Sequence, residues 1–203
     1  MSTNQTDIHF VLDRSGSMWD CKGDTMGGFN SFLASQREDP SGECCMSLHQ
    51  FDHEYITTYA NKSMMDVENL TDETFVPRGQ TALLDAIGRT IKEISDSPSK
   101  KIIVILTDGE ENSSREYTYK HISDLISMKE KDGWQFMFLG ANQDAIQTAS
   151  GLGIRAGGAM TYAQTPQNVD ACFRGLSSAI SRNRSGEDKS VAFSDAERSA
   201  SQQ

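Results

Sequence analysis

Three short runs of mostly apolar residues mark the chain at wide intervals. They cover Ile8–Leu12, in which only His9 is polar, Ile102–Leu106 and Phe136–Leu139. Apolar runs of this length that do not alternate with polar residues are typical of strands covered on both faces. The runs therefore predict three buried strands of a parallel sheet.

Helical periodicity occupies the segments between these runs. Apolar residues recur there at spacings of three and four, which places them on one side of a helix. Four stripes have this spacing: Phe29, Phe32 and Leu33; Leu83, Leu84, Ile87, Ile91 and Ile94; Ile122, Leu125 and Ile126; and Val169, Cys172, Phe173, Leu176 and Ile180.

Two further strands are predicted at residues 44–51 and 54–60. Only Asp52 and His53 separate them, so the two strands must be antiparallel. Strands that alternate with helices elsewhere imply a parallel sheet with helices on both faces and right-handed connections. The pattern as a whole predicts an α/β protein that contains one antiparallel pair.

Length and composition fit one domain followed by a tail. The chain has 203 residues, of which 36% are hydrophobic and 24% charged; this is enough for a full core. We predict a domain over residues 1–183 and a polar tail over residues 184–203, where the periodicity ends. The composition favours a solvated, mobile tail. Its apolar island, residues 191–193, could instead dock on this domain or on a partner.

Charge and targeting signals narrow the kinds of partner. There are 19 basic and 29 acidic residues, for a net charge of −10. No basic stripe interrupts this acidity, so neither nucleic acid nor an anionic membrane is an expected partner. The chain has no apolar run long enough to span a bilayer and no signal-like start, so we expect a cytoplasmic protein. Four cysteines without CxxC spacing fit reduced thiols.

Oxygen-bearing side chains follow two of the predicted strands. Asp13, Ser15 and Ser17 come directly after the first strand, and residues 107–110 (Thr-Asp-Gly-Glu) follow the strand at 102–106. Ligands of parallel sheets bind at the carboxyl ends of the strands, so both turns converge on one edge. Such oxygen donors suit Mg²⁺, Mn²⁺ or Ca²⁺. Each motif alone is also compatible with an ordinary turn or helix cap.

Three motifs together resemble the von Willebrand factor A domain family. They are Asp-x-Ser-x-Ser at 13–17, the threonine of Gly-Gln-Thr-Ala at 79–82, and Thr-Asp-Gly at 107–109. The resemblance covers about residues 6–183, and residues 138–145 are similar to stand-alone bacterial and phage members. It implies a Rossmann-like, doubly wound fold with a mainly parallel six-stranded sheet and one antiparallel edge strand. The family's metal-ion-dependent adhesion site maps onto five residues: Asp13, Ser15, Ser17, Thr81 and Asp108.

The resemblance implies a binding function. In the family the carboxylates often reach the ion through water while the hydroxyls bind it directly, and one coordination position stays open. A carboxylate from another molecule would restore the charge balance and complete the octahedron. The leading hypothesis is a protein-interaction module, not an enzyme, that uses Mg²⁺ (or Mn²⁺ or Ca²⁺) to bind a partner's Glu or Asp. Arg14 and Arg78 flank the loops and are candidates to contact that acidic residue.

Other functions stay open at this point. Many intracellular family members act as adaptors of AAA+ ATPases of the MoxR or chelatase type, and self-association is also compatible with the sequence. A metal-dependent phosphohydrolase is the alternative from another class, because bound Mg²⁺ can activate water or clamp phosphate. The loops, however, lack an evident general base and a phosphate-holding lysine. In the family the last helix moves with the metal site; here that helix would be residues 166–183.

Overall fold

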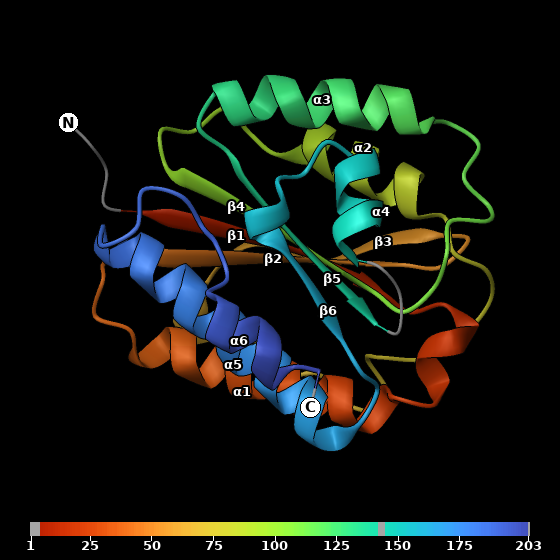
Figure 1. Cartoon of the computed structure of the whole chain (residues 1–203), viewed down its shortest axis with the longest axis horizontal. Coiled ribbons are helices and arrows are strands. Elements are labelled where there is room, and N and C mark those ends of the chain that lie inside the picture. Colours follow the sequence, from red (N-terminus) through yellow and green to blue (C-terminus); the bar gives the residue numbers. More distant parts are fainter. Residues whose placement is uncertain (1–4, 142–144, 203) are drawn as a thin grey trace.

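Six strands form a single sheet in the order β3-β2-β1-β4-β5-β6 (Figure 1). The computed structural model describes residues 5–141 and 145–202, so residues 142–144 of the segment similar to bacterial and phage members lie outside it. All neighbouring strands are parallel except β2 and β3. The predicted sheet with one antiparallel edge strand is thus confirmed. The strands are β1 (Thr6–Asp13), β2 (Cys44–Phe51), β3 (Tyr55–Ser63), β4 (Lys100–Thr107), β5 (Gln135–Ala141) and β6 (Ala159–Tyr162).

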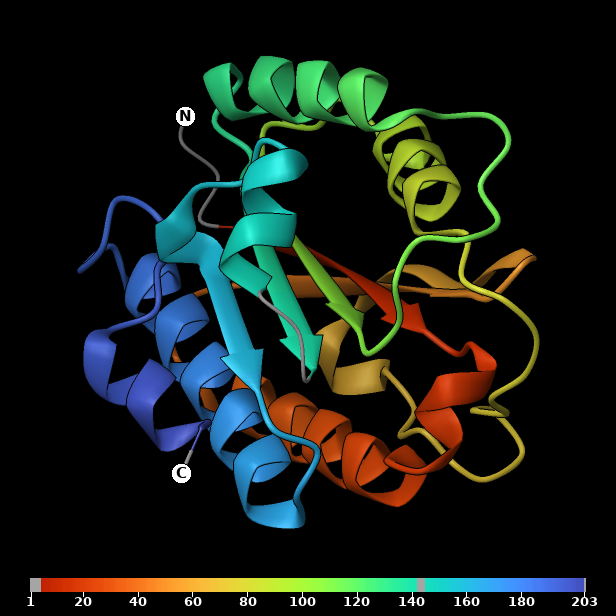
Figure 2. The ribbon, with the colours of Figure 1, turned by 45° about the vertical axis from the view of Figure 1, so that its right-hand side comes forward.

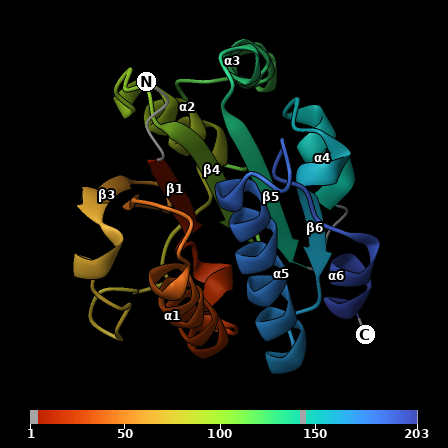
Figure 3. The same ribbon diagram turned by 90° about the vertical axis from the view of Figure 1, so that its left-hand side faces the viewer.

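Helices cover both faces of the sheet (Figures 1 and 3). One face carries α1 (Lys22–Glu38), α5 (Pro166–Ser185) and α6 (Asp195–Ala200), and the other carries α2 (Leu83–Glu93), α3 (Tyr119–Lys131) and α4 (Ala145–Gly151). Short 3₁₀ turns are η1 (Gly16–Trp19), η2 (Met64–Asp66) and η3 (Ala156–Gly158). No helix in the described part of the chain is both long and apolar enough to cross a membrane.

Phe10, in the middle of β1, organises the core beneath α1 and α5. Its ring lies 5.1 Å from Phe29, 5.9 Å from Phe32 and 6.4 Å from Phe173, measured between centroids. Successive residues of a strand point to opposite faces. Val11 therefore belongs to the second core cluster, under α2 and α3. This alternation explains why β1 reads as a continuous apolar run.

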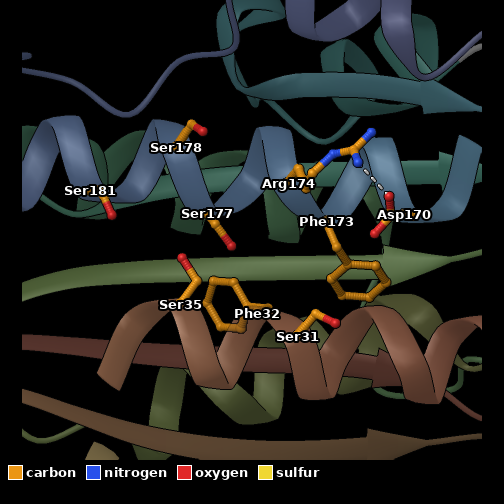
Figure 4. Close-up of a pocket in the computed structure, with 9 residues that line it drawn as sticks. All are labelled: Ser31, Phe32, Ser35, Asp170, Phe173, Arg174, Ser177, Ser178 and Ser181. Atoms are coloured by element: carbon orange, nitrogen blue, oxygen red, sulfur yellow. Dashed lines mark ion pairs between the residues drawn. The ribbon is translucent and has the colours of Figure 1, made fainter. Parts of the chain in front are cut away.

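Helices α1 and α5 meet at Gly28 of α1. A Cβ atom at this position would overlap the Phe173 ring of α5, whereas a Cβ at the neighbouring Gly27 would meet nothing within 4 Å. Farther along, the helices enclose a hollow of about 310 Å³. Figure 4 shows serines of both helices around it, and an Asp170–Arg174 ion pair of 2.7 Å at its rim. Since Asp170 and Arg174 neutralise each other, the lining of the hollow offers no unpaired charge that would attract a charged ligand.

Gly28→Ala should destabilise the protein by about 1–3 kcal/mol, because the added methyl forces Phe173 out of a packed core. Gly27→Ala, the matched control on the solvent side of the same helix, should stabilise it by up to about 1 kcal/mol through helix propensity alone. Urea denaturation of both variants measures the difference. Equal effects would show that α1 and α5 do not pack as described.

Two buried histidines lie on the opposite face of the sheet. The rings of His9 and His49 stack with centroids 5.8 Å apart, so both side chains take part in the packing on this face. Burial, together with the neighbouring His49, lowers the pKa of His9 to about 3. Burial likewise lowers the pKa of His49 to about 4. Both imidazoles are therefore neutral in the folded protein at pH values where an unfolded histidine is protonated.

Protonation of the unfolded chain should make the protein less stable in mild acid. Both histidines bind protons near pH 6.5 when unfolded but only near pH 3–4 when folded. The contribution of these two histidines to stability is therefore complete above pH 6.5 and falls as the pH drops, by up to about 1.4 kcal/mol per pH unit for each histidine. His9→Phe should reduce this slope between pH 6.5 and 5. The same change at the exposed His121 should leave the slope intact in denaturant titrations at each pH.

The C-terminal segment packs on the domain, which corrects the expectation of a solvated tail. Helix α5 continues to Ser185, and both Val191 and Phe193 are buried in the same core cluster as Phe10. Arg182 donates hydrogen bonds to Asp188 at 2.9 Å and to both carboxylate oxygens of Glu197 at 2.8 and 3.1 Å. Of the two alternatives for the apolar island, docking on this domain is therefore observed. The island is too short to produce a periodic pattern in the sequence. The hydrogen bonds of Arg182 add to its burial in holding the C-terminal segment on the domain.

Candidate metal site

The parallel pairing of β1 with β4 brings two oxygen-rich turns together (Figure 2). Asp13, the last residue of β1, is fully buried. Its Oδ1 accepts a hydrogen bond from the Ser15 backbone N–H at 2.6 Å, and its Oδ2 accepts one from the Thr107 hydroxyl at 2.6 Å. Both oxygens are thus held in place by the ends of the two strands.

Three hydroxyl groups surround one point beside Gly109. A Cβ atom at Gly109 would lie 2.8 Å from Thr81 Oγ1, 3.4 Å from Ser17 Oγ and 3.6 Å from Ser15 Oγ. The two serine hydroxyls are 3.1 Å apart, and Ser17 Oγ donates to Asp108 Oδ1 at 2.6 Å. The structure therefore brings all five predicted side chains to one edge of the sheet. We call the three hydroxyls the hydroxyl cluster.

Helix capping does not explain these hydroxyls. The N-cap of α2 is Ala82 rather than Thr81, and Ser15, at the N-cap of η1, makes no side-chain capping bond. Thr81 is instead held through its backbone, which exchanges hydrogen bonds with Asn112: the Thr81 N–H donates to Asn112 Oδ1 at 2.9 Å and the Asn112 N–H to Thr81 O at 3.0 Å. A role as a helix cap therefore does not account for the hydroxyl of Ser15 or of Thr81.

Electrostatics favour a cation at this point. Burial raises the pKa of Asp13 to about 7, although hydrogen bonds from Thr107 and Ser15 oppose the rise. Burial also raises the pKa of Asp108. Among the described residues, no lysine, arginine or histidine forms an ion pair with either carboxylate. A carboxylate that loses water without a counterion is destabilised, and a bound cation removes that penalty. Two carboxylates and three hydroxyls are hard oxygen donors, so the residues fit a divalent ion.

The sequence did not reveal Gln164, which contacts the site from the loop before α5. Its Nε2 donates to Asp108 Oδ2 at 2.9 Å and lies 3.6 Å from the sulfur of Cys21. The next residue, Thr165, caps α5 by accepting from the Asn168 N–H. The hydrogen bond between Gln164 and Asp108 thus connects the beginning of α5 to the site. Only the close approach of distant loops reveals this contact.

Arg14 and Arg78 are occupied elsewhere, which corrects the expectation that they face a partner. Both pair with Asp52, at 3.2 Å from Arg14 and 2.9 Å from Arg78, and Arg78 also pairs with Glu54. Asp52 is fully buried, and its carbonyl accepts from the Ala82 N–H at 2.9 Å. Asp52 therefore connects the loop after β1 to the loop that carries Thr81.

Asp52→Asn should destabilise the protein by about 3–5 kcal/mol, because it removes the nearest counter-charge of the buried Arg14. The control is Glu54→Gln, in the same cluster but more than half exposed, which should cost less than about 1 kcal/mol. Thermal or urea unfolding measures both. A small effect at Asp52 would contradict its role as the connection between the loops.

Comparison with known proteins identifies the family. The chain matches the model of the von Willebrand factor type A domain over residues 7–170. The protein therefore belongs to this family, in agreement with the fold and with the arrangement of its loops. No curated protein matches the chain.

Solved structures share the fold at low sequence identity. Proximal thread matrix protein 1 from the mussel byssus is 18% identical, with a TM-score of 0.64 over 89% of this chain and 47% of that chain. A structure of the same mussel protein with a zinc-occupied MIDAS motif has a TM-score of 0.66 at 16% identity, over 89% of this chain and 47% of that chain. The vWF domain of the type V pili tip protein Mfa5 from Porphyromonas gingivalis is 11% identical, with a TM-score of 0.66 over 89% and 96%. This chain thus spans about half the length of the mussel protein.

Proposed function

We propose that this protein is a metal-dependent protein-interaction module. A divalent cation is held by the hydroxyls of Ser15, Ser17 and Thr81 together with Asp13 and Asp108. Its open coordination position takes a Glu or Asp side chain of a partner protein. The observation that carries the proposal is the hydroxyl cluster, which surrounds one point next to two carboxylates that have no counterion among the described residues.

The position of Ser17 supports an interaction between molecules. Asp13, Ser15 and Thr81 are buried, but Ser17 is exposed to solvent. An ion at the hydroxyl cluster would therefore be approached from outside, on the side of Ser17. Asp13 and Asp108 together balance the charge of a divalent ion, but its other three protein ligands are neutral hydroxyls, so an external carboxylate is the strongest further oxygen ligand for its open position.

Hydrolysis has less support than binding. A phosphohydrolase needs a general base and a positive side chain for the phosphate near the ion. In the described part of the chain, no histidine or lysine forms a hydrogen bond or ion pair with any of the five side chains. Arg14, the nearest cation in sequence, is paired with Asp52. An adaptor of an AAA+ ATPase would use the same site, with the motor as the partner.

The donor set favours Mg²⁺ or Mn²⁺, with Ca²⁺ as the third candidate. All five side chains offer oxygen, and hard cations prefer oxygen ligands over the nitrogen and sulfur ligands typical of zinc. Neither a histidine nor a cysteine belongs to the set. Mn²⁺ is the practical probe because it resembles Mg²⁺ in ligand preference and is paramagnetic.

Asp13→Asn should weaken Mn²⁺ binding by at least about tenfold, because it removes a buried negative charge without changing the shape of the side chain. Thr81→Val should also weaken it, since the variant loses one hydroxyl of the cluster. Calorimetric and electron paramagnetic resonance titrations measure the affinity. Asp124→Asn, an exposed carboxylate on α3, is the control and should bind Mn²⁺ like the native protein. Unchanged affinity in Asp13→Asn would exclude the metal site.

Interaction is tested separately with displayed peptides. Peptides selected on the Mn²⁺-loaded protein should contain Asp or Glu, should lose binding when that residue is changed to Asn or Gln, and should be released by a chelator. Binding that survives both the chelator and the amide change would contradict the proposed function, even if the protein binds Mn²⁺.

A further inference from the structure

A cavity of about 280 Å³ lies beside the hydroxyl cluster. Its walls come from the beginning of α2, the loop after β4, the first residue of α3 and the body of α4. Figure 2 shows that loop as the green segment between the end of β4 and α3. Seven described residues line the cavity: Leu83, Gly109, Glu110, Glu111, Tyr119, Gln147 and Thr148.

Gly109 belongs to both the cavity wall and the hydroxyl cluster. The hydroxyls of Thr81, Ser17 and Ser15 surround the position that a Cβ atom of Gly109 would occupy. Gly109 also lines the cavity. The cavity and the proposed metal site are therefore separated by a single glycine. In an extended peptide, side chains two residues apart on the same face are separated by roughly 7 Å. A partner whose carboxylate reaches the ion can thus place a nearby side chain in the cavity.

The cavity is negatively charged. Glu110 is exposed and forms no ion pair with a described residue, and none of the seven lining residues is basic. Glu111 is held in place: its Oε1 accepts from the Ser113 and Ser114 backbone N–H groups, and its Oε2 accepts from the Leu84 N–H at 2.9 Å. These are charge-assisted bonds to neutral donors, so the negative charge of Glu111 is not compensated by a cation.

Tyr119 adds an aromatic surface to this negative charge. The residue is 45% exposed at the first position of α3. A cation placed over an aromatic face is attracted by its quadrupole, and a guanidinium also stacks on the ring. An arginine can therefore contact both Tyr119 and Glu110, whereas an acidic side chain would be repelled from the cavity.

We propose that this cavity is a second contact of the partner-binding surface and holds an arginine side chain of the same partner whose carboxylate binds the metal. The inference rests on the proposed function, and it narrows the partner to a segment with an acidic residue and an arginine a few positions apart. On a chain with a net charge of −10, the negative cavity would disfavour partners that carry only acidic residues.

Synthetic peptides test the arginine contact. Each peptide has one Asp in a Gly-Ser background and one Arg placed two to four residues before or after it, and a matched peptide has Gln in place of Arg. Fluorescence polarisation on the Mn²⁺-loaded full chain gives the affinities. At one spacing or more, the Arg peptide should bind at least about fivefold tighter than its Gln counterpart, as one ion pair and one cation–π contact predict. If binding is too weak for fluorescence polarisation, ¹⁵N spectra replace it. The backbone amide signal of Glu110 must then shift on addition of the Arg peptide and not on addition of the Gln peptide.

Two variants locate the effect. Glu110→Gln should abolish the Arg advantage, while Glu187→Gln, the same change at an exposed position of the C-terminal segment, should preserve it. Equal binding of Arg and Gln peptides at every spacing, with the requirement for Asp intact, would overturn this inference and leave the proposed function standing. Loss of the requirement for Asp would instead overturn the proposed function.

Discussion

The parallel register between β1 and β4 is the constraint on which the site depends. Leu12 is paired with Leu106, so Asp13 and Thr107, the next residues on the two strands, emerge at the same level of the sheet. The Thr107 hydroxyl donates to Asp13 at this level. A shift of the register by one residue would also exchange the faces of every side chain in β1, and Phe10 would leave its aromatic neighbours. The packing of the core and the geometry of the site are therefore determined by the same backbone pairing.

Most of the fold is predictable from the sequence because its signals are local. The strands β1, β4 and β5 have apolar runs, and α1, α2, α3 and α5 each have an apolar stripe, whereas the short elements β6, α4 and α6 have no such signal. Asp13, Ser15 and Ser17 were identifiable for the same reason, since a strand end and a spacing of two residues are both visible in the chain. Asp108 needed one further step, the rule that parallel strands present their carboxyl ends at one edge, and Thr81 was assigned only through the resemblance of its loop to the family motif.

Other parts depend on contacts between distant residues, which no local pattern indicates. Gln164 reaches Asp108 across 56 positions of the chain, and no periodicity marks it. Arg14 follows Asp13 of the proposed metal site, and its sequence position indicated a place on the binding surface, but its counter-charge Asp52 comes from the turn after β2. The C-terminal segment is polar in composition, yet Arg182 and the buried Phe193 hold it on the domain. In each case a specific pairing outweighs the local preference of the residue.

The two proposed contacts, the metal site and the neighbouring cavity, both depend on charge complementarity with the partner. Without a cation, the edge of the sheet around Asp13 and Asp108 is negative and would repel an acidic partner. A divalent ion cancels these two negative charges and offers an open coordination position for an anion, whereas Glu110 and Glu111 remain negative on the other side of Gly109. The surface then presents a cation next to a negative cavity, and two side chains of the same charge cannot satisfy both. Recognition by such a surface depends on the order and spacing of an acidic and a basic residue, because each charge is attractive in one position and repulsive in the other.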